Sequence, residues 1–428
     1  MKRKLIAAIG VAGMMISIAA CGGGKDDNSD SGDKGGPESF KGKTLTLWAM
    51  DGSTPDKWLA DLTAEFEQKT GAKLKFEEQA WNGIMQKLTT ALSEENPPDV
   101  FEIGNTQTPS YAKTGGLADL SDLKKEIGAD WAENLNKASV VDGVQYAAPW
   151  YFANRVVLYN KSVFKEAGIA APPKTRAEFI AALDKIKAKG KAEPIYLPGQ
   201  NWYHFVGLTI GQGAELVKKD GDKWVSNLGD PKVAAAAELY KQLQSYSKAP
   251  KDKDEATPQQ ADIFAKGKTG AFIGMGWEAA TAIKANPAIE KEIGYFTIPG
   301  ETADKPEGVF LGGSNLAVAE GSKNKALAKE FLKLALSDKY EGELAKVNGV
   351  IPNKESLNVN LKGNPVAEAA APSAAQGGTT PLIPEWAAVE NAPNPIKTYL
   401  TAVLNGKSPA DAAKQVEGEF NKRLAQKQ

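Results

Sequence analysis

The chain has 428 residues, and its 52 Lys and Arg nearly balance its 53 Asp and Glu, for a formal net charge of −1. Interspersed charge of this kind excludes nucleic-acid binding, which needs a basic face. A single histidine and a single cysteine exclude a zinc cluster, a Cys–His nucleophile pair and an intrachain disulfide. We therefore expect no metal, no cofactor and no catalytic histidine or cysteine. The paired carboxylates of a glycosidase, which can lie far apart in a sequence, stay open at this point.

The amino terminus has the parts of an export signal. Residues 2–4 (KRK) are followed by an uncharged apolar stretch at 5–20, shorter than the about 20 residues that span a bilayer comfortably. Small residues then precede Cys21, with glycine after it, which resembles the lipobox of bacterial lipoproteins. We expect residues 1–20 to be a cleaved signal peptide and Cys21 to carry fatty acyl groups such as palmitate. An ordinary signal peptide with an incidental cysteine is the alternative.

Residues 21–43 are mostly Gly, Asp, Ser and Lys, with almost nothing to bury. A segment of this composition stays disordered, and at about 5–6 Å × √n it reaches roughly 25 Å. We expect it to be a tether between the lipidated cysteine and a folded body.

The body begins with alternating strand and helix patterns. In order, these are a strand at residues 44–49, a helix around 58–66, a strand at 73–77, a helix at 84–92 and a strand at 99–103. Gly71 ends the first helix, and two prolines follow the second. Strand–helix–strand order with short connections implies parallel pairing, so we predict an α/β fold.

Helical patterns dominate the rest of the chain. Helices are predicted at residues 176–189, 232–247 and 324–337, with a short strand at 270–274. The last stretch, 394–426, looks helical in two pieces broken at Gly406 and Pro409. The residues after the tether outnumber those that one core usually supports, so we expect two domains.

Eight segments of the body share an order and spacing with one family of binding proteins. They are 95–100 (ENPPDV), 111–120 (YAKTGGLADL), 143–161 (GVQYAAPWYFANRVVLYNK), 164–169 (FKEAGI), 172–175 (PPKT), 264–268 (FAKGK), 274–277 (GMGW) and 324–332 (NKALAKEFL). Together they resemble the extracellular solute-binding proteins of carbohydrate ABC transporters, the group that includes maltose-binding protein. The resemblance covers nearly the whole mature chain.

This resemblance implies two α/β lobes joined by a hinge that the chain crosses three times, with the ligand in the cleft. The first lobe would contain residues 44–149 and 296–336, and the second residues 150–295 and 337–428. The resemblance also implies a monomer held at the outer face of the cell membrane, which is not an enzyme. It would close around its solute and deliver it to the permease subunits of an ABC transporter.

Nine tryptophans fit a sugar site, because sugars present flat C–H faces that stack on aromatic rings. The resemblance places stacking aromatics at Trp277, which ends a Gly-Met-Gly-Trp turn, at Trp202 with Tyr203, and at Trp386. Trp81 is a further candidate. Packing in the core or at the hinge is the alternative for each ring.

Polar candidates come from loops at the carboxyl ends of strands, where open α/β sheets bind ligands. They are Asp51 after the first strand, Asn105 and Thr106 after the third, Tyr151 and Arg155 near the first crossing, and Gly313 and Ser314 after the second. Solvated surface is the alternative for these positions.

The signal and opening residues also resemble those of actinobacterial chitobiose-binding lipoproteins. We therefore expect an oligosaccharide ligand, with chitobiose or an N-acetylglucosamine oligomer ahead of malto-, cello- and xylo-oligosaccharides. The alternative of another class is a lipoprotein that adheres to surface polymer without transport. A cleft containing several aromatics favours transport, whereas an open aromatic face favours adhesion.

Overall fold

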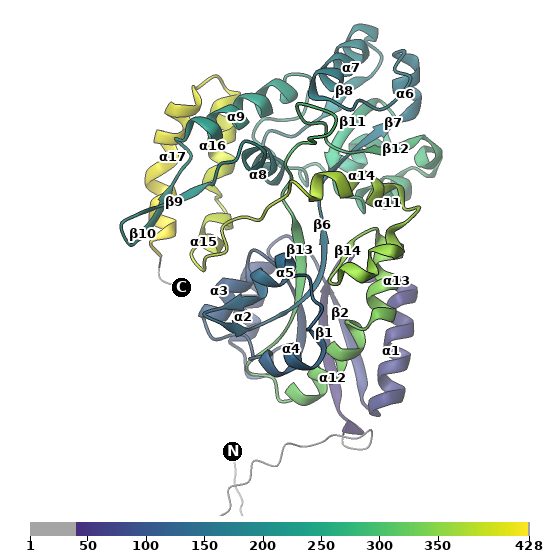
Figure 1. Cartoon of the computed structure of the whole chain (residues 1–428), viewed down its shortest axis with the longest axis vertical. Coiled ribbons are helices and arrows are strands. Elements are labelled where there is room, and N and C mark those ends of the chain that lie inside the picture. The colour runs from purple at the N-terminus through teal and green to yellow at the C-terminus, as the bar shows by residue number, and fades with distance from the viewer. Residues whose placement is uncertain (1–39, 427–428) are drawn as a thin grey trace, which may run out of the picture. The chain divides into compact units, whose positions relative to one another are not determined.

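The computed structural model describes residues 40–426, in which most strands belong to a six-stranded and a four-stranded sheet (Figure 1). The signal peptide, Cys21 and most of the predicted tether lie outside the described residues. Helices cover the sheets, so the predicted α/β class is confirmed. We call the six-stranded sheet with its helices the first lobe, and the four-stranded sheet with its helices the second lobe.

The sheet of the first lobe has the order β14-β6-β13-β3-β1-β2. Its strands are β1 (Thr44–Met50), β2 (Lys73–Gln79), β3 (Val100–Gly104), β6 (Ala148–Ala153), β13 (Gly312–Val318) and β14 (Ile351–Pro352). As predicted, β1 pairs in parallel with both β2 and β3. The later strand β13 enters antiparallel between β3 and β6. Strand β3 therefore lies in the middle of the sheet, between β1 and β13.

Helices pack on both faces of this sheet because the side chains of β1 alternate between two apolar clusters. Leu45 and Leu47 face one cluster, whereas Met50 faces the other. The helices of this lobe are α1 (Asp56–Thr70), α2 (Ile84–Leu92), α3 (Thr108–Lys113), α4 (Ser121–Ile127), α5 (Glu133–Asn136), α12 (Lys325–Ala335) and α13 (Asp338–Asn348). Helix α1 ends at Gly71, whose φ of 70° lies in the left-handed region that glycine adopts without strain.

The sheet of the second lobe has the order β12-β7-β11-β8. Its strands are β7 (Val156–Asn160), β8 (Glu193–Tyr196), β11 (Thr269–Gly274) and β12 (Ile293–Phe296). Its helices are α6 (Lys161–Glu166), α7 (Arg176–Lys189), α8 (Trp202–Gly211), α9 (Pro231–Gln244), α10 (Gln260–Ala265), α11 (Glu278–Ala285), α14 (Pro365–Ala374), α15 (Trp386–Glu390), α16 (Pro395–Leu404) and α17 (Pro409–Leu424). The predicted break near Gly406 and Pro409 separates α16 from α17 and is confirmed.

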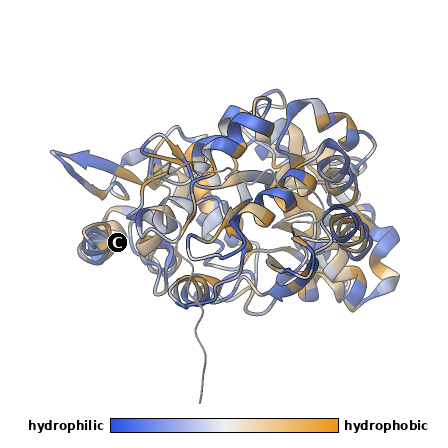
Figure 2. Cartoon of the chain, turned by 90° about the horizontal axis from the view of Figure 1, so that it is seen from below, coloured by the Kyte–Doolittle hydropathy of each residue, from blue (hydrophilic) through white to orange (hydrophobic). Residues whose placement is uncertain are grey.

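Two small hairpins complete the architecture. One joins β4 (Val140–Val141) to β5 (Val144–Gln145), and the other joins β9 (Val217–Asp220) to β10 (Lys223–Ser226). The second hairpin projects from its lobe and carries mostly hydrophilic residues, in contrast to the hydrophobic strands of the sheets (Figure 2). No helix among residues 40–426 combines the length and the apolar character needed to cross a bilayer.

The first two crossings between the sheets lie later than predicted. Strand β6 stays in the first sheet because Trp150 is buried against Trp58 there, with ring centroids 6.0 Å apart. The chain therefore crosses at Asn154–Arg155, a few residues past the predicted boundary at 149. After β12 the chain stays against the second core through Phe310 and enters the first sheet at Gly312, rather than at 296.

The third crossing differs most from the prediction, which put it near residues 336–338. Tyr340 and Leu344 of α13 are fully buried in the first core, where α13 packs beside α1 (Figure 1). Strand β14 then pairs with β6. The chain reaches the second lobe only with α14, which packs on β12 and β7. Amphipathic helices of similar composition serve both lobes, so the sequence pattern alone does not assign α13 to one of them.

The body also begins earlier than predicted. Phe40 is buried in the first core although residues 21–43 were expected to be tether. The Lys43 carbonyl accepts a hydrogen bond from the Lys73 N–H at 2.8 Å, which extends the β1–β2 pairing by one step. Burial of this aromatic side chain helps to hold the short segment against the core.

Candidate ligand-binding site

A cleft lies where the first sheet, the first crossing and the second lobe meet, and both lobes line it. Its volume is about 230 Å³, whereas two other hollows of the structure measure about 450 and 690 Å³. The cleft is therefore identified as the candidate binding site by the residues that line it and not by its volume. Four exposed or half-buried rings and a series of polar groups converge on it. The rings are Trp81, Trp277, Tyr151 and Tyr203, and the polar side chains include Asp51, Ser53, Asn105, Thr106, Gln107, Asn154, Arg155, Ser314 and Asn348.

Two tryptophans stand exposed in this cleft. Trp81, in the loop between β2 and α2, is 43% exposed, and Trp277 is 46% exposed. Trp277 follows β11 and occupies the N-cap position of α11. A side chain on the preceding Gly276 would meet Val366 of α14 at 2.3 Å, so only glycine lets this turn pack there. Large apolar rings are costly to expose in a soluble protein, and two of them in one cleft indicate a ligand with apolar faces.

A column of aromatic and cationic groups forms another part of the wall. Tyr203 stacks on Phe310 with ring centroids 4.6 Å apart and an interplanar angle of 12°. The Arg155 guanidinium lies 5.4 Å from the centroid of the Tyr203 ring. It also forms a 2.6 Å ion pair with Glu255. Arg155 is thus held in place from the second lobe while it lines the cleft.

Two buried polar atoms of the first crossing lack a partner among the described residues. They are the Arg155 Nε, a donor, and the Asn154 Oδ1, an acceptor. Both residues line the cleft. A buried polar group without a partner is costly, and both atoms are covered by protein here, so a ligand in the cleft would reach them only after a local rearrangement.

A buried carboxyl lies beneath the floor of the cleft. Glu102, on the central strand β3, has no exposed surface, and burial raises its pKa. Its Oε2 accepts the Met50 N–H at 2.7 Å. Its Oε1 accepts hydrogen bonds from Ser53 Oγ at 2.9 Å, from the Tyr151 hydroxyl at 2.8 Å and from Ser314 Oγ. These three hydroxyl residues line the cleft, so the carboxyl orients them from below.

Asn105 and Thr106 are positioned by contacts that leave only part of each side chain free. Asn105 donates its amide N–H to the Leu311 carbonyl at 3.1 Å, and its backbone N–H bonds to the Gly313 carbonyl. Thr106 donates its hydroxyl to Glu390 at 3.0 Å. Burial raises the pKa of Glu390 to about 7. A side chain on Gly313 would lie 2.4 Å from the Tyr151 carbonyl, so the two strands approach too closely here for any other residue.

A second buried carboxyl supports the Trp277 turn. Glu278 accepts hydrogen bonds from the Met275 N–H at 2.7 Å and from the Gln260 amide at 2.8 Å. Burial raises its pKa to about 7. The turn that carries Trp277 is therefore tied to α10 through Glu278.

The structure brings ten of the twelve predicted pocket residues to this cleft. They are Asp51, Trp81, Asn105, Thr106, Tyr151, Arg155, Tyr203, Trp277, Gly313 and Ser314. These ten share one cavity although they come from strands, loops and turns far apart in the chain.

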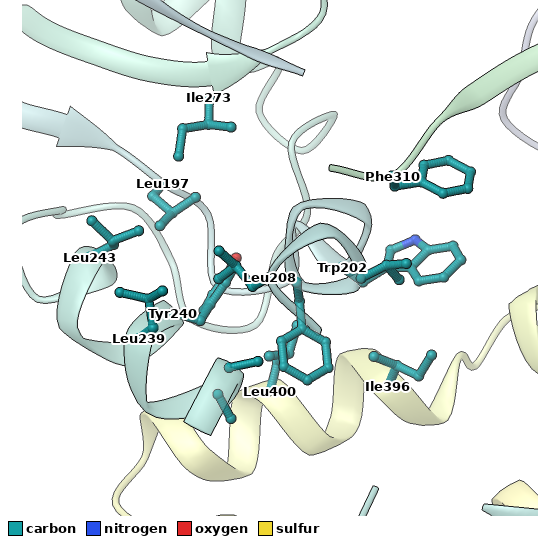
Figure 3. Close-up of a cluster of buried hydrophobic side chains, with 14 of the residues drawn as sticks. Leu197, Trp202, Leu208, Leu239, Tyr240, Leu243, Ile273, Phe310, Ile396 and Leu400 are labelled. Atoms are coloured by element: carbon teal, nitrogen blue, oxygen red, sulfur yellow. The ribbon is translucent and has the colours of Figure 1, made fainter. Parts of the chain in front are cut away.

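Trp202 and Trp386 do not line the cleft, and the predictions for them need correction. Trp202 is 6% exposed and lies in the buried cluster with Phe310 and Ile396 (Figure 3). Trp386 is fully buried, packs against Phe420 at 6.3 Å and donates its indole N–H to Glu390 at 2.7 Å. Each ring finds apolar partners in the second lobe, and burying it there is more favourable than leaving it in a wet cleft.

Several residues of the site escaped the sequence reasoning. They include Ser53, Glu102, Gln107, Asn154, Phe310, Asn348 and Val366. Ser53 and Asn154 lie next to predicted residues, so the rule that places binding groups in loops after strands could have identified them. Glu102 was not, because a lone acidic residue in a buried strand looks like an ordinary strand position. Among the described residues, no three His, Cys, Asp or Glu side chains cluster as a metal site.

The chain is similar in sequence to known binding proteins. The sequence profile of the bacterial extracellular solute-binding proteins matches residues 51–342. The chain is 77% identical to the diacetylchitobiose binding protein DasA of Streptomyces coelicolor, over the whole length of both chains. It is 24% identical to the maltodextrin-binding protein MdxE of Bacillus subtilis, with 90% of each chain covered.

Solved structures share the fold. The GacH receptor of Streptomyces glaucescens, solved unliganded and with acarbose, superposes with a TM-score of 0.77 at 23% identity, over 90% of this chain and 99% of that one. A solute-binding protein of Thermotoga lettingae bound with α-D-tagatose also gives a TM-score of 0.77, at 24% identity, over 90% of this chain and 100% of that one. The predicted two-lobed binding-protein fold is thus confirmed.

Proposed function

Because the chain belongs to the bacterial extracellular solute-binding protein family, we propose that its cleft captures N,N′-diacetylchitobiose and presents it to an ABC importer. The observation that carries the choice of sugar is the full-length identity to the diacetylchitobiose binding protein. Other di- and oligosaccharides, such as malto-, cello- and xylo-oligomers, are the rival ligands.

The chemistry of the cleft supports a sugar of this kind. Trp81 and Trp277 offer exposed ring faces to the C–H faces of pyranose rings. Arg155 lines the cleft, and its guanidinium carries only donors, which suit an acetamido carbonyl or a sugar oxygen. The hydroxyls above Glu102 suit hydroxyl or N–H groups. Such a mixture of ring faces and convergent polar groups is what a carbohydrate requires.

We also propose how the protein is placed in the cell. Cleavage before Cys21 and acylation of its thiol would hold a monomer at the outer face of the cell membrane. The sugar would favour the state in which both lobes touch it, since only differential contacts shift such an equilibrium. The permease subunits would then receive the closed form.

The proposal includes no catalytic step, and binding proteins of this family generally act by binding alone. Glu102 and Glu278 are buried carboxyls at or near the cleft and Glu390 is a partly buried one, and each is held by internal hydrogen bonds. A glycosidase needs two carboxyls that reach the scissile bond from opposite sides. Adhesion to a surface polymer is also disfavoured, because the exposed rings stand in a cleft rather than on an open face.

Thermal-shift measurements against a sugar panel test the proposal. The panel would contain N,N′-diacetylchitobiose, maltose, cellobiose and xylobiose. A ligand at one hundred times its Kd stabilises the folded chain by about 2.7 kcal/mol, which is a shift of several degrees. We expect the largest shift with N,N′-diacetylchitobiose. A larger shift with another disaccharide would make that disaccharide the proposed ligand. The absence of a shift with every sugar of the panel would refute the proposed function.

A further inference from the structure

A fully buried carboxyl gathers three hydroxyl groups that reach it from separate parts of the chain. Ser53 follows β1, Tyr151 belongs to β6 and Ser314 belongs to β13, and all three line the cleft. Glu102 lies on β3, between β1 and β13, where it can face all of them. Glu102 does not itself line the cleft, so any effect it has on a ligand acts through the hydroxyls.

The hydrogen-bond geometry accounts for each hydroxyl proton. Ser53, Tyr151 and Ser314 all donate to Glu102 Oε1, while Oε2 is occupied by the Met50 N–H. The Tyr151 hydroxyl oxygen also lies 2.8 Å from Ser53 Oγ and 3.3 Å from Ser314 Oγ. A proton that turns away from the carboxyl therefore still meets an oxygen of the same cluster.

A serine hydroxyl that rotates freely can either donate to a ligand or accept from it. These hydroxyls lose that choice where Glu102 is ionised, because a carboxylate offers only acceptors and takes their protons. Burial raises the pKa of Glu102, and the four hydrogen bonds donated to its two oxygens oppose that rise and favour the ionised form. What remains toward the cleft is oxygen lone pairs. The Arg155 guanidinium, a donor of the wall, belongs to the first crossing and not to this floor.

We propose that Glu102 is a positioning residue that makes the floor of the cleft a hydrogen-bond acceptor, so that the bound sugar must present a hydroxyl or an amide N–H there. The inference rests on the proposed function and adds a selection rule to it. A sugar hydroxyl or an acetamido N–H satisfies the floor. A group that only accepts, such as fluorine or an ether oxygen, leaves the lone pairs of the floor unpaired.

Glu102→Gln is the decisive variant, because it reverses the polarity of the floor at nearly constant shape. The Met50 N–H requires an acceptor, so the new amide oxygen must take the place of Oε2. The amide NH₂ then takes the place of Oε1 and donates to the hydroxyl oxygens. Their own protons turn toward the cleft, and the floor becomes a donor.

The probes are N,N′-diacetylchitobiose and analogues in which one hydroxyl is replaced by fluorine or one acetamido nitrogen is methylated. Binding of each to the purified full-length chain is measured by titration calorimetry. We expect at least one analogue to bind the wild type about tenfold or more weakly than the parent sugar. Glu102→Gln should weaken binding of the parent sugar by a similar factor. In this variant the same analogue should bind less than about threefold more weakly than the parent sugar.

Controls separate this effect from a structural one. Glu341 is a second fully buried carboxyl of the first lobe, and it accepts the Asn353 N–H rather than a cleft hydroxyl. Glu341→Gln should leave the pattern of analogue penalties unchanged. If Glu102→Gln does not fold, Ser314→Ala replaces it, because removing one acceptor of the floor should also shrink the penalty.

The outcomes are distinct. Equal penalties in the wild type and in Glu102→Gln or Ser314→Ala would overturn this inference alone, as would a wild type that binds every analogue like the parent. A wild type that does not bind the parent sugar would overturn the proposed function, and this inference with it.

Discussion

Trp277→Ala should separate ligand binding from folding more cleanly than any other single change in the cleft. The ring is 46% exposed and sits at the N-cap of α11, after the strand rather than inside the core. Its backbone environment depends on Gly276 and on Glu278, which both remain. The substitution therefore removes a ring face from the cleft and leaves the turn intact.

The two free energies differ in size. Truncating a central aromatic at a binding site commonly costs about 2 kcal/mol or more, which is roughly thirtyfold in Kd. Full burial of a large apolar side chain stabilises a fold by about 1.5–3 kcal/mol, so a half-exposed ring contributes about 1 kcal/mol. We expect binding of N,N′-diacetylchitobiose to weaken about thirtyfold while Tm falls by no more than about 4 °C.

Calorimetric titration together with thermal melting measures both quantities on the same sample. Trp224→Ala is the matched control, because Trp224 is a half-buried ring on the projecting hairpin and does not line the cleft. Trp386→Ala is the opposite control, since loss of this fully buried ring should cost about 3–5 kcal/mol of stability. A Trp277→Ala chain that binds the sugar with the wild-type Kd would refute the stacking role.

Three further outcomes are expected. Cys21→Ala should release the chain from the membrane fraction or leave its signal uncleaved, with sugar binding intact; a cleaved variant that stays in the membrane fraction would contradict the anchor. Sugar binding should persist in EDTA, and chromatography should recover N,N′-diacetylchitobiose unchanged after incubation, whereas steady release of monosaccharide would reveal an enzyme. Burial raises the pKa of Glu390 from 4.5 to about 7. Between these two pH values the folded chain keeps a proton on Glu390 that the unfolded chain has lost. The free energy of unfolding therefore falls as the pH rises from about 4.5 to about 7. The free energy of unfolding of Glu390→Gln, relative to that of the wild type, should therefore increase by up to about 3 kcal/mol across this pH range, as measured by thermal melting at several pH values. A stability difference that does not change with pH would contradict a raised pKa at Glu390.

Much of the local structure follows from the sequence alone. The helix of Trp58, Leu62 and Phe66 buries these residues, and it ends at Gly71 as expected. The break near Gly406 and Pro409 separates two helices at the predicted place. These features depend on spacing within a few residues and on the backbone preferences of glycine and proline, so neighbours along the chain determine them.

Part of the site was also predicted from residues that lie in loops directly after a strand. Asp51, Asn105 and Thr106 reach the cleft because they follow parallel strands of one sheet, whose carboxyl ends meet at one edge. That rule concerns topology, which strand–helix alternation already indicates.

Only the tertiary structure decided which tryptophans face the cleft, where the third crossing lies and what Glu102 does. Trp277 and Trp386 both sit at the start of a short helix, yet Trp386 is buried because Phe420, from another helix, packs against it. In the sequence Glu102 resembles any strand residue, because its partners Tyr151 and Ser314 belong to strands that are distant along the chain. Burial and hydrogen-bond partnership at these positions come from residues distant in sequence, and no local pattern contains that information.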